Sequence, residues 1–191
     1  LGAVWTRHGA RPGDLLAVSG SPGKAGAGAR IAGTLGEGAR GPEWASLLES
    51  WREPVARVGL ARALGGTGGV TAAIDISDGV GGDLARLCDA SGVGVEIIES
   101  VWPADEALAR AATALGDTLE SLRFGPSDDY ELLLAIDPAS RDGCAAVAGR
   151  LNVPLAFVGK FTDAPEVLTV RDARGAPRVL RASGYDHFAG G

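Results

Sequence analysis

The stretch that decides the fold runs from Ala72 to Leu87 and reads AAIDISDGVGGDLARL. It opens with a short apolar run that stops at Asp75, a pattern typical of a buried strand. Residues 77–79 then supply a turn, and Leu84 and Leu87 recur at the spacing of one helical face. The stretch therefore predicts a strand, a polar turn and a helix. Such a junction often binds phosphate or metal, and it also occurs without any function.

Strand-like and helix-like segments alternate along the rest of the chain. Strands are predicted over residues 13–20, 69–76, 92–99, 129–136 and 154–161. Helices are predicted after the glycine-rich turn at residue 21, after residue 78, and over residues 43–50, 56–64, 104–115 and 140–151. Residues 166–181 predict a hairpin and residues 183–191 a terminal loop. This order indicates an α+β fold, a mixed sheet with helical cover.

Composition and charge narrow the class of protein. With 191 residues, of which 46% are hydrophobic, the chain fits a single soluble domain over residues 1–191. A net charge of -6 argues against a general nucleic-acid binder, because no basic surplus exists to neutralise a phosphate backbone. The sequence has no apolar run of membrane-spanning length and no signal pattern. The chain begins at Leu1 without any methionine, so we expect a fragment or a processed chain.

The two cysteines, Cys88 and Cys144, lie in apolar helical patterns without metal-ligand spacing. They are expected to be reduced core residues, which favours a cytoplasmic location.

Asp75, at the end of the predicted strand, and Asp78, at the start of the helix, are close enough for both carboxylates to face one small space. Mg²⁺ typically takes one or two protein carboxylates and completes its shell with water and phosphate. Ser77 has a hydroxyl that is suited to a phosphate oxygen. The alternative is that Ser77 or Asp78 only caps the helix.

A second acidic group, Asp128 and Asp129, precedes the strand that carries Tyr130 and Glu131. Adjacent carboxylates repel each other, so a cation would relieve them. The alternative is a solvated turn after Pro126.

Three further features are weaker. The glycine-rich segment SPGKAGAG, residues 21–28, resembles a phosphate-binding loop without its usual spacing, and a tight helix-packing turn explains it equally. Arg7 is able to meet phosphate or to contact only water. His187 lies in the tail without a cysteine or serine partner for a nucleophilic triad, and no catalytic residue is assigned.

Four segments taken together carry a family resemblance: GARPGDLLAVSGSPGKAGAG (9–28), AIDISDGVGGDL (73–84), SDDYELLLAI (127–136) and GYDHF (184–188). They resemble the C-terminal half of the thiamine-monophosphate kinases, which are related to aminoimidazole ribonucleotide synthetase. The resemblance implies a three-layer α/β/α domain with a mixed sheet. It also implies that an N-terminal domain, which binds metal and forms a homodimer, is absent from this chain.

The resemblance further implies transfer of the γ-phosphoryl group of ATP to thiamine monophosphate, giving thiamine diphosphate, with Mg²⁺ screening the phosphates. Asp75 and Asp78 match metal ligands, Ser77 an ATP contact and Arg7 a contact to the nucleotide phosphates. Three positions match the substrate site: Asp128, Asp129 and the aromatic Tyr185. The half alone is expected to be inactive.

The chain departs from the family pattern at three positions. Ser127 replaces a glycine, Asp128 replaces a glutamate, and Lys24 stands where the family carries an acidic residue. Two alternatives remain: a non-catalytic binding or assembly module of the same fold, and another enzyme of the related family. Among those enzymes, the hydrogenase-maturation relative is disfavoured because this chain ends in FAGG rather than in a cysteine.

Overall fold

A computed structural model describes residues 4–165, 167–172 and 174–180 of the chain. Within this part the strands are β1 (Leu15–Ser19), β2 (Val70–Asp75), β3 (Gly94–Ile98), β4 (Leu132–Ile136), β5 (Leu155–Thr162), β6 (Leu168–Arg171) and β7 (Pro177–Val179). They form one mixed sheet in the order β2-β4-β1-β5-β3-β6-β7. Neighbouring strands are antiparallel except β3 and β6, which run parallel.

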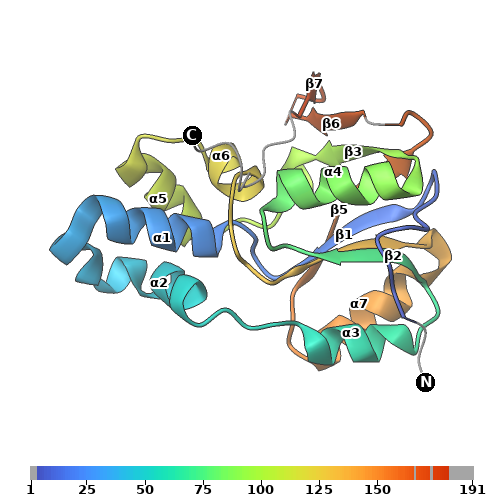
Figure 1. Cartoon of the computed structure of the whole chain (residues 1–191), viewed down its shortest axis with the longest axis horizontal. Helices are drawn as coiled ribbons and strands as arrows, with labels where there is room; N and C mark the ends of the chain where they lie inside the picture. The colour runs from blue at the N-terminus through green and yellow to red at the C-terminus, as the bar shows by residue number, and fades with distance from the viewer. Residues whose placement is uncertain (1–3, 166, 173, 181–191) are drawn as a thin grey trace.

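The helices surround this sheet (Figure 1). The α-helices are α1 (Lys24–Leu35), α2 (Ala45–Arg52), α3 (Val58–Gly65), α4 (Val80–Ser91), α5 (Glu106–Leu115), α6 (Leu119–Phe124) and α7 (Arg141–Arg150). Short 3₁₀ helices are η1 (Gly36–Arg40), η2 (Pro42–Trp44), η3 (Glu99–Val101) and η4 (Pro138–Ser140).

Alternation along the strands builds a separate core on each face of the sheet. Leu16 and Val18 of β1 face α4 and pack with Leu84 and Leu87, whereas Ala17 faces the opposite side. There α3 and α7 cover the sheet. Successive residues of a strand point to opposite faces, so each central strand contributes to both cores. The predicted three-layer α/β/α arrangement is confirmed.

A third core lies beside the sheet, in a group of four helices, α1, α2, α5 and α6, that we call the helical lobe. Ile31 of α1, Leu47 of α2 and Leu108 of α5 are almost fully buried there. The closest approach is between α1 and α2, where a Cβ on Gly28 would lie 2.2 Å from the carbonyl oxygen of Leu47. The glycines of residues 21–28 therefore allow tight helix packing, as the packing alternative expected.

One element was not predicted, and one expected strand has a different start. Helix α6 was not predicted, because its six residues are too few to display a helical period. The strand expected over 129–136 begins only at Leu132, because Tyr130 has a positive φ of 52°, which is incompatible with an extended strand. The hairpin expected near the end of the chain is confirmed as β6 and β7.

Two smaller expectations also have outcomes. In the described part of the chain, Cys88 and Cys144 are buried free thiols, and burial raises the pKa of Cys88 to about 12. None of the described helices has the length and apolar character needed to cross a bilayer.

Candidate functional site

The turn between β2 and α4 presents the first predicted group of polar residues. Asp75 is the last residue of β2 and is exposed, while Ser77 and Asp78 are half-buried. Gly79 precedes the helix with a φ of 104°, and a Cβ there would lie 2.1 Å from the carbonyl oxygen of Gly125. Only glycine fits both the positive φ and the close approach, so this residue fixes the path of the turn.

A buried carboxylate, which the sequence analysis did not single out, holds this turn. One oxygen of Asp83 accepts the backbone N–H groups of Ser77 (3.0 Å) and Asp78 (2.9 Å). The side chain of Asp83 is only 2% exposed. Among the described residues no side chain caps α4 from its N-cap position, so the simple capping explanation for Ser77 and Asp78 does not hold.

Arg86, one turn further along α4, neutralises both neighbouring aspartates. Its Nη1 lies 2.5 Å from Asp78 Oδ2 and 2.7 Å from Asp83 Oδ1. Burial acts to lower the pKa of Arg86, but the hydrogen bonds to Asp83 and Asp78 outweigh it, so the pKa is raised from its ordinary value. Arg86 therefore stays charged and shares one positive charge between two carboxylates.

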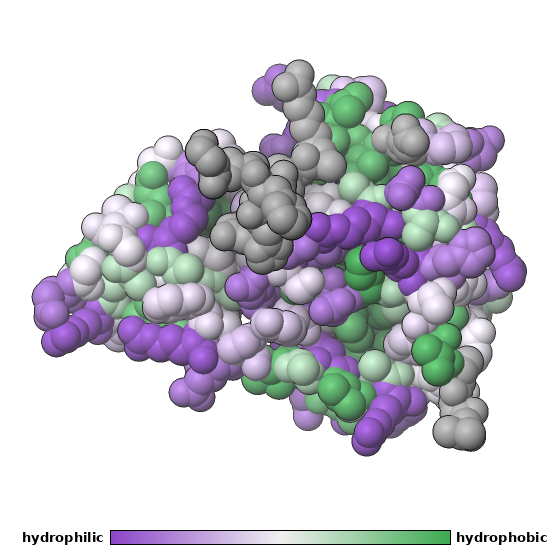
Figure 2. All heavy atoms as spheres, in the orientation of Figure 1, coloured by the Kyte–Doolittle hydropathy of each residue, from purple (hydrophilic) through white to green (hydrophobic). Residues whose placement is uncertain are grey.

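A hollow of about 560 Å³ opens above this turn and brings together four residues singled out from the sequence: Arg7, Asp75, Ser77 and Asp78. Arg7 reaches it because Thr6 accepts a backbone hydrogen bond (2.9 Å) from Ala73 of β2, which places the N-terminal segment along the edge of the sheet. Hydrophilic side chains run across the middle of this face of the molecule, around α4 (Figure 2).

The donor atoms of this hollow suit a hard cation only in part. Within the described residues, no group of three or more His, Cys, Asp or Glu side chains could hold a metal ion. Asp75 and Asp78 supply two carboxylates, which is the number that Mg²⁺ commonly takes from a protein when phosphate and water complete its shell. The residues fit Mg²⁺ as two ligands of an incomplete protein shell.

The second predicted group separates into two environments. Asp128 is exposed, whereas Asp129 is only 8% exposed and its carboxylate accepts the N–H groups of Gly23 (2.6 Å) and Ala25 (3.0 Å). Burial raises the pKa of Asp129 despite those hydrogen bonds. Ser127 is buried too and accepts the N–H of Gly26 at 2.8 Å. The solvated-turn alternative therefore fails for Ser127 and Asp129.

Backbone hydrogen bonds join the two groups. The N–H of Tyr130 donates to the carbonyl of Ile76 and the N–H of Ile76 donates to the carbonyl of Glu131, both at 2.8 Å. These two bonds extend the β2–β4 pairing past Asp75 and Leu132. In this geometry Tyr130 has a strained backbone with a positive φ, and the residue remains 42% exposed.

A partly buried ion pair, between Arg57 and Glu131, lies next to the second group. Arg57 donates to both oxygens of Glu131, at 2.7 Å from Nε and 2.5 Å from Nη2. The hydroxyl of Ser19 donates to the same carboxylate at 2.5 Å. The hydrogen bond to Glu131 is the main reason that the pKa of Arg57 is raised. Such a bidentate pair ties the linker before α3 to the ends of β1 and β4.

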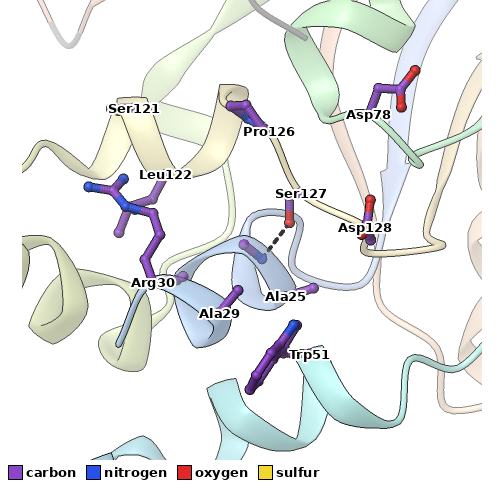
Figure 3. A pocket seen from close by; sticks show the side chains of 12 residues that line it. Ala25, Ala29, Arg30, Trp51, Asp78, Ser121, Leu122, Pro126, Ser127 and Asp128 are labelled. Atoms are coloured by element: carbon purple, nitrogen blue, oxygen red, sulfur yellow. Dashed lines mark hydrogen bonds between the residues drawn. The ribbon is translucent and has the colours of Figure 1, made fainter. Parts of the chain in front are cut away.

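A second hollow, of about 530 Å³, lies beside the first, between the helical lobe and the turn. Figure 3 shows Trp51 of α2 on one side, the small residues Ala25 and Ala29 of α1 as one wall, and Asp128 and Asp78 on the other side. Asp78 lines both hollows. The structure thus places Asp128 next to the β2–α4 turn.

The remaining predicted residues lie elsewhere. Tyr185 and His187 fall outside the described residues. Lys24 is the first residue of α1, and its Nζ atom lies 3.9 Å from Oδ2 of Asp105. The sequence analysis missed Asp83, Arg86 and Glu131. The only sequence signal for the first two was their spacing of three residues on one helix, which allows an ion pair but also occurs on solvated surfaces.

Residues 11–171 match the model of the AIR synthase related protein, C-terminal domain. The chain belongs to this family. It is 33% identical to thiamine-monophosphate kinase of Escherichia coli K12 over 192 residues, which covers 99% of the chain and 57% of that protein. The chain therefore spans little more than half the length of this curated relative.

Solved structures agree with the family assignment. Thiamine-monophosphate kinase from Stenotrophomonas maltophilia superposes with a TM-score of 0.75 at 27% identity, covering 88% of this chain and 52% of that one. AaThiL complexed with AMPPCP and TMP superposes with a TM-score of 0.77 at 24% identity, covering 96% and 54%, and shows a shared fold.

Proposed function

We propose that this chain is the C-terminal half of an ATP-dependent kinase that phosphorylates thiamine monophosphate to thiamine diphosphate. The observation that carries the proposal is the position of Asp78, which lines both hollows. Phosphoryl transfer requires the donor phosphate and the acceptor phosphate to lie side by side, next to a group that helps to neutralise their negative charge. Two adjacent sites that share the residue Asp78 meet that requirement.

The first hollow is assigned to the nucleotide. Asp75 and Asp78 would hold Mg²⁺, which supplies charge neutralisation of the phosphates when bound. Arg7 would contact a phosphate of ATP through its guanidinium group, and Ser77 through its hydroxyl. Proximity of these groups to one opening supports this assignment.

The second hollow is assigned to thiamine monophosphate. Its thiazolium ring is a cation, which suits the carboxylate of Asp128 and the indole face of Trp51. Asp129 would act on the substrate site through the loop that it holds at Gly23 and Ala25. Tyr185 is proposed as an aromatic contact to the same substrate.

The proposal extends to the rest of the protein. A metal-binding N-terminal half, joined to this one, would complete the Mg²⁺ shell and form a homodimer. The buried free thiols of Cys88 and Cys144 support a cytoplasmic location. The AMPPCP and TMP bound to AaThiL support ATP and thiamine monophosphate as the ligands.

The substitution Asp75→Asn tests the assignment in a protein that contains both halves. Asparagine keeps the size and one oxygen but removes the charge, so thiamine diphosphate formation should fall by roughly 100-fold or more. The free energy of unfolding should change by less than about 1 kcal/mol, because Asp75 is exposed.

The matched control is Asp163→Asn, an exposed aspartate in the loop after β5, which should leave the rate unchanged. Product is measured by chromatography and stability by urea unfolding. Full activity in Asp75→Asn would end the metal-ligand assignment. An intact wild-type protein that binds ATP but forms no thiamine diphosphate would favour the non-catalytic module instead.

A further inference from the structure

Arg86 occupies a position that neither the sequence motifs nor the family match assigns. Its single Nη1 atom contacts Asp78 and Asp83 at the same time. It also lines the first hollow together with Arg7 and Asp75. Arg86 is therefore able to pair with two kinds of group in the first hollow: the carboxylate of Asp78 and an anionic ligand.

The two ion pairs of Arg86 differ in how easily they can be broken. Asp83 is buried, and its other oxygen is fixed by two backbone N–H groups, so this carboxylate cannot leave. Asp78 is partly exposed, with 24% of its side chain accessible, and it lines both hollows. The contact to Asp83 therefore anchors Arg86, whereas the contact to Asp78 is the one that a competing cation is able to replace.

We propose that Arg86 is the resident counter-ion of Asp78, displaced from it by a divalent cation and then available, still anchored on Asp83, as a ligand for the phosphate that arrives with the cation. This inference rests on the proposed function of the hollow as a nucleotide site. It makes Arg86 a positioning residue for that site.

The charges give this arrangement a specific consequence. A divalent cation alone is opposed by Arg86, and a polyphosphate alone is opposed by the carboxylate of Asp75. When both are present, the cation takes the carboxylates and Arg86 turns to a phosphate oxygen, so each ligand removes the obstacle to the other. Cation and phosphate are therefore expected to bind more tightly together than separately.

The test uses the 191-residue chain and two simple probes, Mn²⁺ and inorganic tripolyphosphate. Paramagnetic broadening of the amide signals of residues 75–78 in ¹⁵N spectra reports Mn²⁺ at the turn. Shifts of the same signals, measured with a chelator, report tripolyphosphate. The variants are Arg86→Gln, which removes the charge, Arg86→Lys, which keeps it, and Arg62→Gln, which removes an exposed charge on α3 as a control.

In Arg86→Gln, half-saturation by Mn²⁺ should require on the order of tenfold less metal, because a positive charge beside the site is gone. Tripolyphosphate should bind several-fold more weakly, because a charge-assisted hydrogen bond is lost. Arg86→Lys should stay close to wild type for Mn²⁺, and Arg62→Gln should change neither titration by more than about twofold, because that charge is exposed and screened.

Opposite changes for the two probes are the signature, since a purely structural role of Arg86 would weaken both. Equal Mn²⁺ affinity in wild type and Arg86→Gln would overturn the inference, as would absence of broadening at residues 75–78 in every variant. Should Arg86→Gln fail to fold, a tenfold gain in Mn²⁺ affinity in Arg86→Lys would overturn it too, because that variant keeps the charge. If the titrations of Arg86→Gln match those of wild type but the two-domain protein makes thiamine diphosphate, only the role of Arg86 is refuted. If the two-domain protein forms no thiamine diphosphate, the proposed function fails, independently of Arg86.

Discussion

Gly28 shows how a single missing side chain sets the packing of the helical lobe. A Cβ at this position would lie 2.2 Å from the carbonyl oxygen of Leu47 and 3.1 Å from the Cβ of Trp51. Backbone atoms cannot yield as a flexible side chain does, so any larger residue must push α1 away from α2. Because Trp51 lines the second hollow, this displacement would also alter that site.

We expect Gly28→Ala to lower the free energy of unfolding by about 1–3 kcal/mol, the usual cost of overpacking. The matched control is Gly33→Ala in the same helix, where no described heavy atom lies within 4 Å of the added Cβ. That change should raise the free energy of unfolding by about 0.5–1 kcal/mol, because alanine is the better helix former. Urea unfolding of both variants checks the pair, and equal signs would contradict the close-contact argument.

At this scale the sequence allowed part of the site to be predicted. Asp75, Ser77 and Asp78 follow an apolar strand directly, and the structure brings them into one hollow with Arg7. Asp83 and Arg86 could not be recognised, because their importance depends on which backbone groups and carboxylates the fold places beside them. Burial of Asp129 was equally hidden, since its partners, Gly23 and Ala25, lie about a hundred residues earlier in the chain.

Two helices of the helical lobe, α5 and α6, are each capped at the N-terminus by a side chain. The carboxylate of Asp105 accepts the N–H of Leu108 (3.0 Å) at the start of α5 and the hydroxyl of Ser21 (2.7 Å). Thr118 caps α6 in the same way but with a neutral hydroxyl, which accepts the N–H of Ser121 at 3.0 Å. The two caps provide a charged and an uncharged version of one interaction.

Removal of each cap should cost about 1 kcal/mol, but with different pH dependence. Burial acts to raise the pKa of Asp105, while its hydrogen bonds and Lys24 outweigh burial and lower the pKa overall. A lowered pKa in the folded state means that its contribution is complete above the unfolded pKa of about 3.9 and is lost as the pH falls through the folded value.

The loss caused by Asp105→Ala should therefore shrink as urea unfolding is moved from pH 7 to about pH 3. The loss caused by Thr118→Ala should stay constant, because a hydroxyl does not titrate in this range. Parallel pH curves for the two variants would show that the charge of Asp105 adds nothing to its cap.

At the level of elements, the long periodic segments were predictable and the short irregular ones were not. The strand that ends at Asp75 and the helix that carries Leu84 and Leu87 are found where their patterns placed them. Helix α6 was not predicted because it spans less than two turns. The late start of β4 depends on Tyr130, whose neighbours Asp129 and Glu131 bind groups far away in the chain, and no local propensity indicates its positive φ.

The whole molecule combines a sheet with two covered faces and a helical lobe with its own core. The second hollow opens where these parts meet, so it takes residues from both. The first hollow is lined by the N-terminal segment, β2 and the β2–α4 turn. Trp51 and Ala25 belong to the lobe, whereas Asp78 belongs to the turn that leaves the sheet. Their relative position is therefore a property of the complete domain and could not be predicted from any single motif.

We expect the chain without an N-terminal half to bind Mg²⁺-ATP weakly, with a dissociation constant of about 0.1 mM or weaker, equivalent to about -5.5 kcal/mol. Asp75 and Asp78 supply only two ligands of the Mg²⁺ shell, and among the described residues no third acidic, histidine or cysteine side chain joins them. Isothermal titration calorimetry measures this directly. Micromolar binding would show that this half is a sufficient nucleotide site and would refute the half-site argument.

The pair of backbone hydrogen bonds between Ile76 and Tyr130 has a mechanical consequence. Because they continue the ladder of β2 and β4, the spacing of the two loops is set by the strand-to-strand distance of the sheet. The β2–α4 turn and the loop that carries Asp128 then move with the sheet as one rigid body, on any timescale shorter than strand separation. Opening and closing of the second hollow is therefore expected to come from its helical walls, α1 and α2, while the distance between the turn and the loop stays fixed.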